Sequence, residues 1–243
     1  MNKLLNFEFR NAFKMLYVRL MPFILLAFGL LCGYMNTSTM EEELLEYCQM
    51  DELPQLMTVL SWIVTLIGGL LICKDYTQNT IRNKIIVGHS RTKIYLAKQV
   101  VVTAIYLLNA AVFYIGYTVS NILIVGTAHL NKNGLARVTV CIFVSYLMLS
   151  LFACFLSMTV KGTLGGALPM LAVYGTLFIS ALREMMQSKF LEYASDIIPM
   201  GSLMSSSVSD PYPHLLRSCI LMTCFSVACL CTGIAIFRRT NLN

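Results

Sequence analysis

The residues that could carry out chemistry are few in this sequence and lie far apart. Its three histidines, His89, His129 and His214, form no H-E-x-x-H or comparable metal-ligand set. None of the nine cysteines belongs to a C-x-x-C pair, and most lie inside apolar runs, where a cysteine usually packs as a small hydrophobe. The sequence therefore gives little support to a zinc site, a disulfide framework or a membrane protease.

The sequence also lacks a phosphate-binding loop. Lys161, Gly162 and Thr163 hold the letters of G-x-x-x-x-G-K-[ST] in the wrong order, so the backbone cradle and its lysine are absent. The acidic run from Glu41 to Glu43 has no nearby partners and fits a solvated face. We therefore expect that the isolated chain is not an enzyme, does not hydrolyse ATP and binds no metal or cofactor.

Composition excludes a soluble domain. Of the 243 residues, 57% are hydrophobic and 12% are charged, and the mean hydropathy is +0.71. A soluble domain carries about 25% charged residues, and half that number could not cover its surface. We therefore expect one transmembrane domain over residues 1–243.

Six stretches free of Asp, Glu, Lys and Arg are long enough to cross a bilayer. About 20 helical residues span a hydrocarbon core about 30 Å thick, and a charge at the centre costs about 2.5–3.5 kcal/mol. The sequence therefore predicts an all-α membrane protein with six transmembrane helices. The expected spans are about 20–40, 53–73, 99–125, 138–160, 162–182 and 218–237.

The distribution of basic residues predicts the orientation. With a cytoplasmic N-terminus, the inside segments carry 13 of the 18 lysines and arginines and only two acids, Glu8 and Asp75. Segments rich in Lys and Arg stay in the cytoplasm. We expect a multi-pass protein of the cell membrane with cytoplasmic N- and C-termini. Because topology accounts for the net charge of +6, that charge gives no support to nucleic-acid binding.

The N-terminal segment fits an amphipathic interfacial helix. Phe7 breaks an otherwise regular pattern. A basic face beside an apolar one is typical of a helix in the inner headgroup layer, in contact with lipid. An ordinary lead-in to the first span is the alternative. The apolar face would comprise Leu5, Phe9, Ala12, Phe13 and Leu16, and the polar face Lys3, Asn6, Arg10 and Lys14.

The outer segment 183–217 mixes apolar and polar residues around a turn. Pro199 and Gly201 mark that turn. Two interpretations stay open: a possible re-entrant outer helical hairpin before the last span, or a solvated loop with a helical start.

The segment 74–98 is the longest inner piece between two spans. Thr77, Ile81 and Ile85 fall on one helical face, and Gly88 is a plausible helix stop. The pattern predicts a short helix beneath the membrane, from Thr77 to the residue before that glycine. A basic loop that only sets topology is the alternative.

The polar groups inside the spans are neutral. Four of them on the third span could line a translocation path: Asn109, Tyr114, Tyr117 and Asn121. Such groups more commonly bond between helices, and this is the safer interpretation of each one alone. Proton- and sodium-coupled carriers usually place an ionisable group mid-membrane, so its absence weakens a secondary-carrier function.

The inner loop and the whole layout resemble type-2 ABC transporter permeases. In that family the loop commonly holds an acidic residue, a G-T-I-R-N-like stretch and an S-R pair. Here these are Asp75, residues 80–83 and residues 90–91, with Asn79 where the family often has Gly. The resemblance extends over the full length, from the amphipathic N-terminus to the long outer segment before the last span.

The resemblance implies the transmembrane subunit of an ATP-binding-cassette exporter, which forms the translocation path. Two permease subunits, identical or related, would each bind a cytoplasmic nucleotide-binding ATPase subunit that uses ATP and Mg²⁺. The substrate would be an amphipathic peptide or a hydrophobic small molecule. The coupling helix that docks in the ATPase would comprise Thr77, Thr80, Ile81, Arg82, Lys84, Ile85 and Gly88.

Two isoleucines would form the docking edge of that helix. Ile81 and Ile85 lie one turn apart, so they can present one apolar edge to a partner groove. Arg82 and Lys84 could steer an acidic partner surface.

Two other functions stay open: a membrane-embedded binding or assembly protein without a transport cycle, and a secondary carrier. An ATPase gene beside this one would favour the exporter.

Overall fold

The described part of the chain consists of helices and the short connections between them. The computed structural model describes residues 2–38, 45–125, 132–160, 163–186, 189–190 and 212–239. No strand occurs in these ranges, which confirms the predicted all-α class. The helices are α1 (Asn2–Phe13), α2 (Leu16–Ser38), α3 (Leu45–Thr77), α4 (Thr80–Ile86), α5 (Arg91–Val125), α6 (Lys132–Thr159), α7 (Thr163–Met186) and α10 (Tyr212–Arg239).

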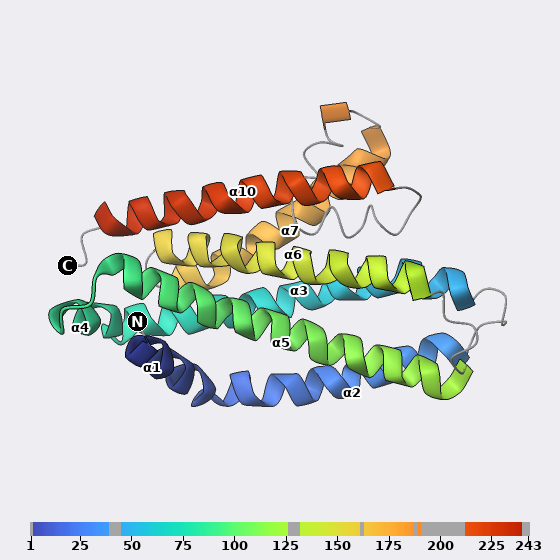
Figure 1. Cartoon of the computed structure of the whole chain (residues 1–243), viewed down its shortest axis with the longest axis horizontal. Helices are drawn as coiled ribbons and strands as arrows, with labels where there is room; N and C mark the ends of the chain where they lie inside the picture. The colour runs from blue at the N-terminus through green and yellow to red at the C-terminus, as the bar shows by residue number, and fades with distance from the viewer. Residues whose placement is uncertain are drawn as a thin grey trace.

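The long helices run side by side in one bundle (Figure 1). Helix α5 is central, because it packs against α1, α2, α3, α6 and α10. Helix α3 packs on α6 and α7, and α10 packs mainly on α6. The short helices α1 and α4 lie at one end of the bundle, where α10 also ends (Figure 1).

Within the described residues, five helices are long and apolar enough to cross a membrane, so the chain is a multi-pass membrane protein. They correspond to five of the six predicted spans. The sixth, in α7, has an apolar stretch of only Leu164–Gly175 among the described residues. The five are Leu16–Met35, Leu53–Thr77, Arg91–Ile124, Val138–Thr159 and Cys219–Arg239.

The first and third of these spans begin earlier than residues 20 and 99, where the charge-free stretches begin. Arg19 lies in the first turns of α2 with its side chain exposed, so its charge can reach water while the helix continues. Lys98 lies inside α5 and is buried against two carboxylates. A charge therefore need not end a membrane helix where it can reach water or a partner.

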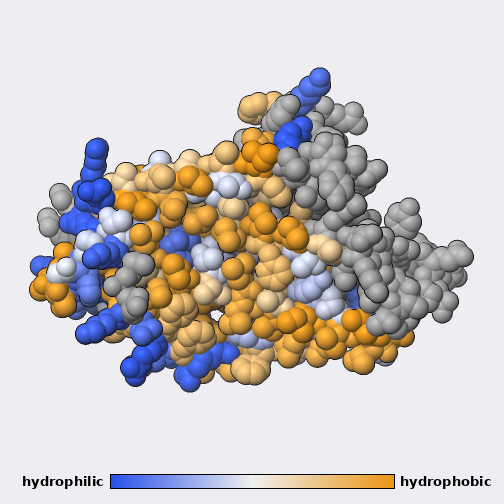
Figure 2. All heavy atoms as spheres, viewed as in Figure 1, coloured by the Kyte–Doolittle hydropathy of each residue, from blue (hydrophilic) through white to orange (hydrophobic). Residues whose placement is uncertain are grey.

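The surface has the pattern of a membrane protein. Figure 2 shows hydrophobic side chains over the middle of the bundle and hydrophilic ones at the end where α1 and α4 lie. Of the five long apolar helices, α2 has the smallest buried share, 22% of its most apolar stretch. Exposed Phe23, Leu31 and Met35 on this helix fit contact with lipid tails.

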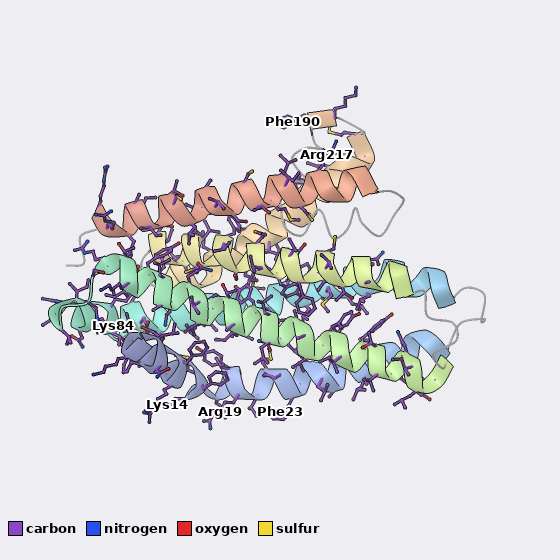
Figure 3. All side chains as sticks on the ribbon, viewed as in Figure 1. Lys14, Arg19, Phe23, Lys84, Phe190 and Arg217 are labelled. Carbon is purple, nitrogen blue, oxygen red and sulfur yellow. The ribbon has the colours of Figure 1, made fainter. Side chains whose placement is uncertain are left out.

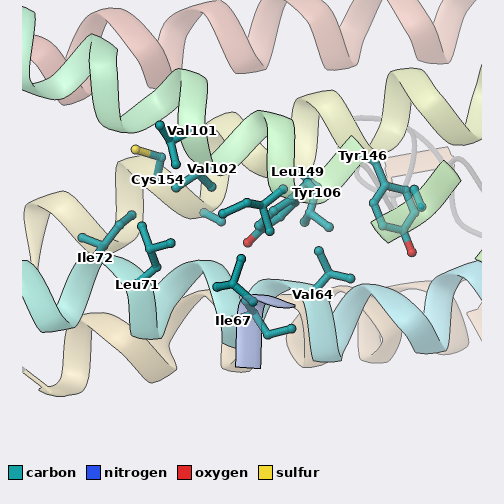
Figure 4. Close-up of a cluster of buried hydrophobic side chains, with 14 of the residues drawn as sticks. Val64, Ile67, Leu71, Ile72, Val101, Val102, Tyr106, Tyr146, Leu149 and Cys154 are labelled. Atoms are coloured by element: carbon teal, nitrogen blue, oxygen red, sulfur yellow. The ribbon is translucent and has the colours of Figure 1, made fainter. Parts of the chain in front are cut away.

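The core lies between α3, α5 and α6 (Figure 4). Val64, Ile67 and Leu71 of α3 pack there with Val101 and Val102 of α5. Two tyrosines add polar links between the helices. The Tyr146 hydroxyl donates to the Met57 carbonyl at 2.7 Å, and the Tyr106 hydroxyl to the Thr65 carbonyl at 3.5 Å. In a membrane, apolar side chains can pack on lipid as well as on a neighbouring helix. Hydrogen bonds between helices therefore help to hold the bundle together.

Glycines let α2 approach α5 at backbone distance. A Cβ added at Gly29 would lie 2.6 Å from the Phe113 carbonyl oxygen, and one at Gly116 would lie 2.8 Å from the Leu26 carbonyl oxygen. Gly33 follows Gly29 after one turn and meets α5 in the same way. This is the small-xxx-small packing of membrane helices.

Replacing Gly29 by alanine should therefore lower the thermal unfolding temperature. The added methyl would force two backbones apart, and overpacking typically costs about 1–3 kcal/mol. The matched control is Gly175→Ala in α7, because a Cβ there meets nothing within 4 Å. Unfolding in detergent, followed by size-exclusion fluorescence, compares the two. Equal unfolding temperatures would contradict the close approach of α2 to α5.

Two predicted features lie wholly or mainly outside the described residues. Most of the outer segment 183–217, including the expected turn at Pro199 and Gly201, falls there, and so does the acidic run from Glu41 to Glu43. The re-entrant hairpin thus stays a prediction.

Candidate functional site

The short helix α4 is set off from its neighbours by two residues in left-handed conformations. Asn79 has φ 54° and ψ 21°, and Gly88 has φ 96°. Asn is among the few residues other than glycine that adopt this conformation readily, so Asn79 can stand where glycine would. At the other end, Gly88 N–H donates to Ile85 O at 2.9 Å and His89 N–H to Lys84 O at 3.1 Å, which is a Schellman stop.

These breaks correct the predicted start of the helix. Thr77 is the last residue of α3, and its hydroxyl donates to the Lys74 carbonyl at 3.0 Å. Helix α4 begins at Thr80, because the left-handed Asn79 interrupts the helical backbone. The predicted stop at Gly88 is confirmed.

Four charged side chains meet behind α4 and form a buried ionic cluster. Lys84 of α4 pairs with Glu8 of α1, and with Asp75 of α3 at 3.1 Å. Lys98 of α5 pairs with Asp75 at 2.6 Å and with Glu8 at 3.1 Å. Each lysine thus contacts both acids, and four helices meet at one point. We call Glu8, Asp75, Lys84 and Lys98 the charge cluster.

The charge cluster is neutral and almost free of solvent contact. The side chains of Glu8 and Asp75 are 0% and 1% exposed, and the two lysines are hardly more so. Lys84 also lies over the Phe7 ring, with its Nζ 5.7 Å from the ring centroid. Buried charges need partners of opposite sign, because an isolated one costs several kcal/mol. The cluster therefore fixes where α1 and α4 lie on α3 and α5.

Sequence reasoning missed this cluster. It used Glu8 only to count charges, used Asp75 to count charges and as the acidic residue of the family-like loop, and assigned Lys84 to steering a partner surface. That role for Lys84 is wrong in this conformation, because its ammonium is buried between two carboxylates. The usable signal was that these are the only two acids in the basic inner segments. A lone acid among many bases is a candidate for a specific ion pair.

The predicted apolar edge of α4 also needs correction. Ile81 is 2% exposed and belongs to the core, and Ile85 is partly buried against that core. The pair therefore faces the bundle. The exposed apolar side chains are the next two along the chain, Ile86 at 72% and Val87 at 77%. Arg82 is exposed as predicted, next to the buried Ile81.

Two further hydrogen bonds join this end of the bundle. Arg91, at the start of α5, donates to the Arg238 carbonyl of α10 at 3.0 Å. The Tyr76 hydroxyl of α3 donates to the Met158 carbonyl of α6 at 2.8 Å. Together with the charge cluster, these bonds connect the ends of α1, α3, α4, α5, α6 and α10.

The four candidate path-lining residues all lie on α5 among packed helices. Asn109, Tyr117 and Asn121 are buried, and Tyr114 is partly buried. Asn109 donates to the Ile105 carbonyl at 2.7 Å, and the Tyr114 hydroxyl bonds to Thr139 Oγ1 of α6 at 2.6 Å. The side-chain oxygens of both asparagines lack a hydrogen-bond partner among the described residues.

No metal centre stands out in the described ranges, where no three His, Cys, Asp or Glu side chains are grouped to hold an ion. The eight cysteines whose state is described there are free thiols.

Comparison with protein families places this chain in one of them. A family model covers residues 15–242, nearly the whole chain, and its description is "Protein of unknown function (DUF2705)". No curated protein matches the chain at a significant level. Because the model covers far more than half of the sequence, the chain belongs to the DUF2705 family.

Proposed function

We propose that this chain is the transmembrane subunit of an ATP-binding-cassette exporter that couples through α4 to a separate ATPase chain. The observation that supports it is the way α4 is held. The charge cluster fixes one side of α4 to three other helices, while Ile86 and Val87 project from its end. A helix that is held against the bundle on one side, and exposes apolar side chains at its end, is suited to bind a protein partner.

The same arrangement would carry a displacement from α4 into the bundle. Helices α3 and α5 are the longest, with 33 and 35 residues, and each supplies one charge to the cluster. Breaking a buried ion pair is costly, so the four helices should move together. A partner that pushes on α4 would thus shift two helices that run the length of the bundle.

The proposal includes a sixth span and an orientation. Helix α7 has 24 residues, which at 1.5 Å each can cross about 30 Å of hydrocarbon. Gly166 of α7 touches Gly69 of α3 at backbone distance, so α7 lies against a membrane-spanning helix. Six spans would bring both termini to the side of α4, which the excess of basic residues assigns to the cytoplasm.

The proposed assembly contains two permease subunits, identical or related, and two ATPase subunits that bind ATP and Mg²⁺. The proposed substrate is an amphipathic peptide or a hydrophobic small molecule. Neutral polar groups on α5 support this choice, since Asn109 and Asn121 each keep a side-chain oxygen without a hydrogen-bond partner among the described residues. Such oxygen atoms could accept hydrogen bonds from a substrate when the helices separate.

The alternatives are a membrane-embedded binding or assembly protein without a transport cycle, and a secondary carrier. The carrier has less support, because the charged residues buried in the described spans, Asp75 and Lys98, lie at the end of the bundle and are paired with each other. Coupled carriers usually place such groups in the pathway.

The test is to purify the chain alone and together with any nucleotide-binding ATPase that a neighbouring gene encodes. We expect no ATP hydrolysis by the chain alone, and hydrolysis by a stable complex of the two. A complex with a catalytically inactive ATPase is the control for contaminants. Because such ATPases are cytoplasmic, binding at α4 would also establish the orientation. Failure to form a complex would favour an assembly protein. Substrate movement driven by an ion gradient alone would favour a carrier.

A further inference from the structure

Helix α1 turns a basic stripe away from the bundle. Lys3 and Arg10 of α1 are exposed, and so is Lys14, which directly follows α1 and donates its N–H to the Arg10 carbonyl at 3.1 Å. At 100° per residue, the three lie within about 40° of one another around the helix axis. Phe7 lies on one side of the stripe and is 50% exposed, and Phe13 lies on the other side and is 41% exposed. Basic side chains thus lie between two aromatic edges.

Among the described residues 2–38, the basic stripe has no exposed acid to neutralise it. Glu8 is the only acid among residues 2–38, and its side chain is fully buried in the charge cluster. Arg19, in the first turns of α2, adds a fourth exposed cation and donates to the Lys14 carbonyl at 3.5 Å. Burial of Glu8 therefore leaves this surface with a charge of one sign.

The structure changes which face of α1 is available to lipid. Much of the face that the sequence assigned to the headgroup layer, including Ala12 and parts of Leu5 and Phe9, packs into the protein. The exposed face is the basic one, and it continues into the apolar surface of α2 at Leu16 and Leu20. Figure 3 shows Lys14, Arg19 and Phe23 along this outer edge, pointing away from the bundle.

We infer that Lys3, Arg10, Lys14 and Arg19 bind the headgroups of anionic phospholipids in preference to zwitterionic ones. The position supports lipid as the ligand, because the cations lie where a membrane-spanning helix leaves the bilayer and apolar side chains surround them. Lys and Arg near a membrane surface attract anionic lipid, and Arg matches the geometry of a phosphate. The inference rests on the multi-pass architecture and not on the proposed transport function.

The experiment uses one tryptophan as a reporter of nearby lipid. Trp62 is the only tryptophan, so Trp62→Phe with Phe13→Trp leaves a single indole beside the basic stripe. The full-length protein is reconstituted in phosphatidylcholine vesicles. In one sample a minor fraction of the lipid is dibrominated phosphatidylglycerol, and in the other the same fraction is dibrominated phosphatidylcholine. Bromine quenches indole fluorescence at short range, so the ratio of quenching measures headgroup preference.

We expect stronger quenching by the phosphatidylglycerol and a decline of that preference with added salt. Arg10→Gln with Lys14→Gln should reduce the preference by about fivefold for each charge removed. The charge-conserving pair Arg10→Lys with Lys14→Arg should retain it. The matched control, Arg82→Gln with Lys93→Gln, removes two exposed cations from the same end of the bundle and should leave it unchanged.

Three results would overturn the inference. Equal quenching by the two lipids would show no headgroup preference. If the control pair lost the phosphatidylglycerol preference to the same extent, the preference would reflect only the net charge of the protein. Complete displacement by inorganic phosphate at constant ionic strength would show a site for free phosphate and not for lipid. Size-exclusion profiles of each variant confirm that it is folded.

Discussion

Replacing Lys98 by methionine should lower the free energy of unfolding by about 3–5 kcal/mol. The substitution keeps an apolar stem of similar length but removes the ammonium that contacts both Glu8 and Asp75. Two buried carboxylates would then share the single charge of Lys84. Removing an exposed ion pair costs at most about 1 kcal/mol of unfolding free energy. The loss in Lys98→Met is larger because it leaves two buried carboxylates with too few positively charged partners. Denaturant unfolding in detergent measures it.

Lys93→Met is the matched control for this variant. Lys93 also lies on α5, near the same end, but its side chain is exposed, so the change should be within about 0.5 kcal/mol. Glu8→Gln together with Lys98→Met removes one charge of each sign and leaves Asp75 paired with Lys84 at 3.1 Å. That double variant should lose less than the sum of the two single ones. Additive losses, or equal stability of the two lysine variants, would refute the cluster.

Ile86→Asp and Val87→Asp should each weaken association with the proposed ATPase subunit roughly tenfold to a hundredfold. Burial of one such side chain in a partner contributes about 1.5–3 kcal/mol, and an aspartate cannot replace that contribution. Because both side chains are mostly exposed in the isolated chain, neither change should alter its folding. The measurement is the amount of ATPase that co-purifies with each variant, with transport as the second readout.

Asn83→Asp is the control for the added charge. Asn83 is an exposed residue of α4, so the variant brings the same negative charge to the same helix without removing an apolar side chain. Ile81→Asp tests the opposite case, since burial of Ile81 predicts loss of folding and not of docking alone. If the Ile86 and Val87 variants retain the ATPase as well as Asn83→Asp does, the end of α4 is not the docking site.

The spans could be predicted because hydrophobicity over about 20 residues has one simple structural outcome in a bilayer. Five of the six appear as long apolar helices, and they differ from the prediction mainly at charged ends such as Arg19 and Lys98. The stop of α4 was also predictable, because a glycine in a left-handed conformation is a local property of the chain. Its start was not, because an asparagine is less diagnostic of that conformation.

The candidate site could be predicted only in part. Helical periodicity placed Ile81 and Ile85 on one face but could not say whether that face meets the bundle or a partner. The charge cluster could not be predicted from the sequence for a different reason. Its members lie on four helices, and Glu8 pairs with a lysine 90 residues away. No local pattern relates such positions. A substrate path poses the same difficulty, since it depends on how helices separate.

The separation of Glu8 from its partners has a consequence for biosynthesis. Glu8 leaves the ribosome before Lys84 and Lys98, which follow only after the two apolar helices α2 and α3 have been made. Until then no partner exists for its buried position, so α1 must wait in water or at the lipid surface while α2 and α3 insert. Its docking on α5 can therefore only follow the synthesis of α2 and α3, so that α1 is made before these two helices but reaches its final place after them.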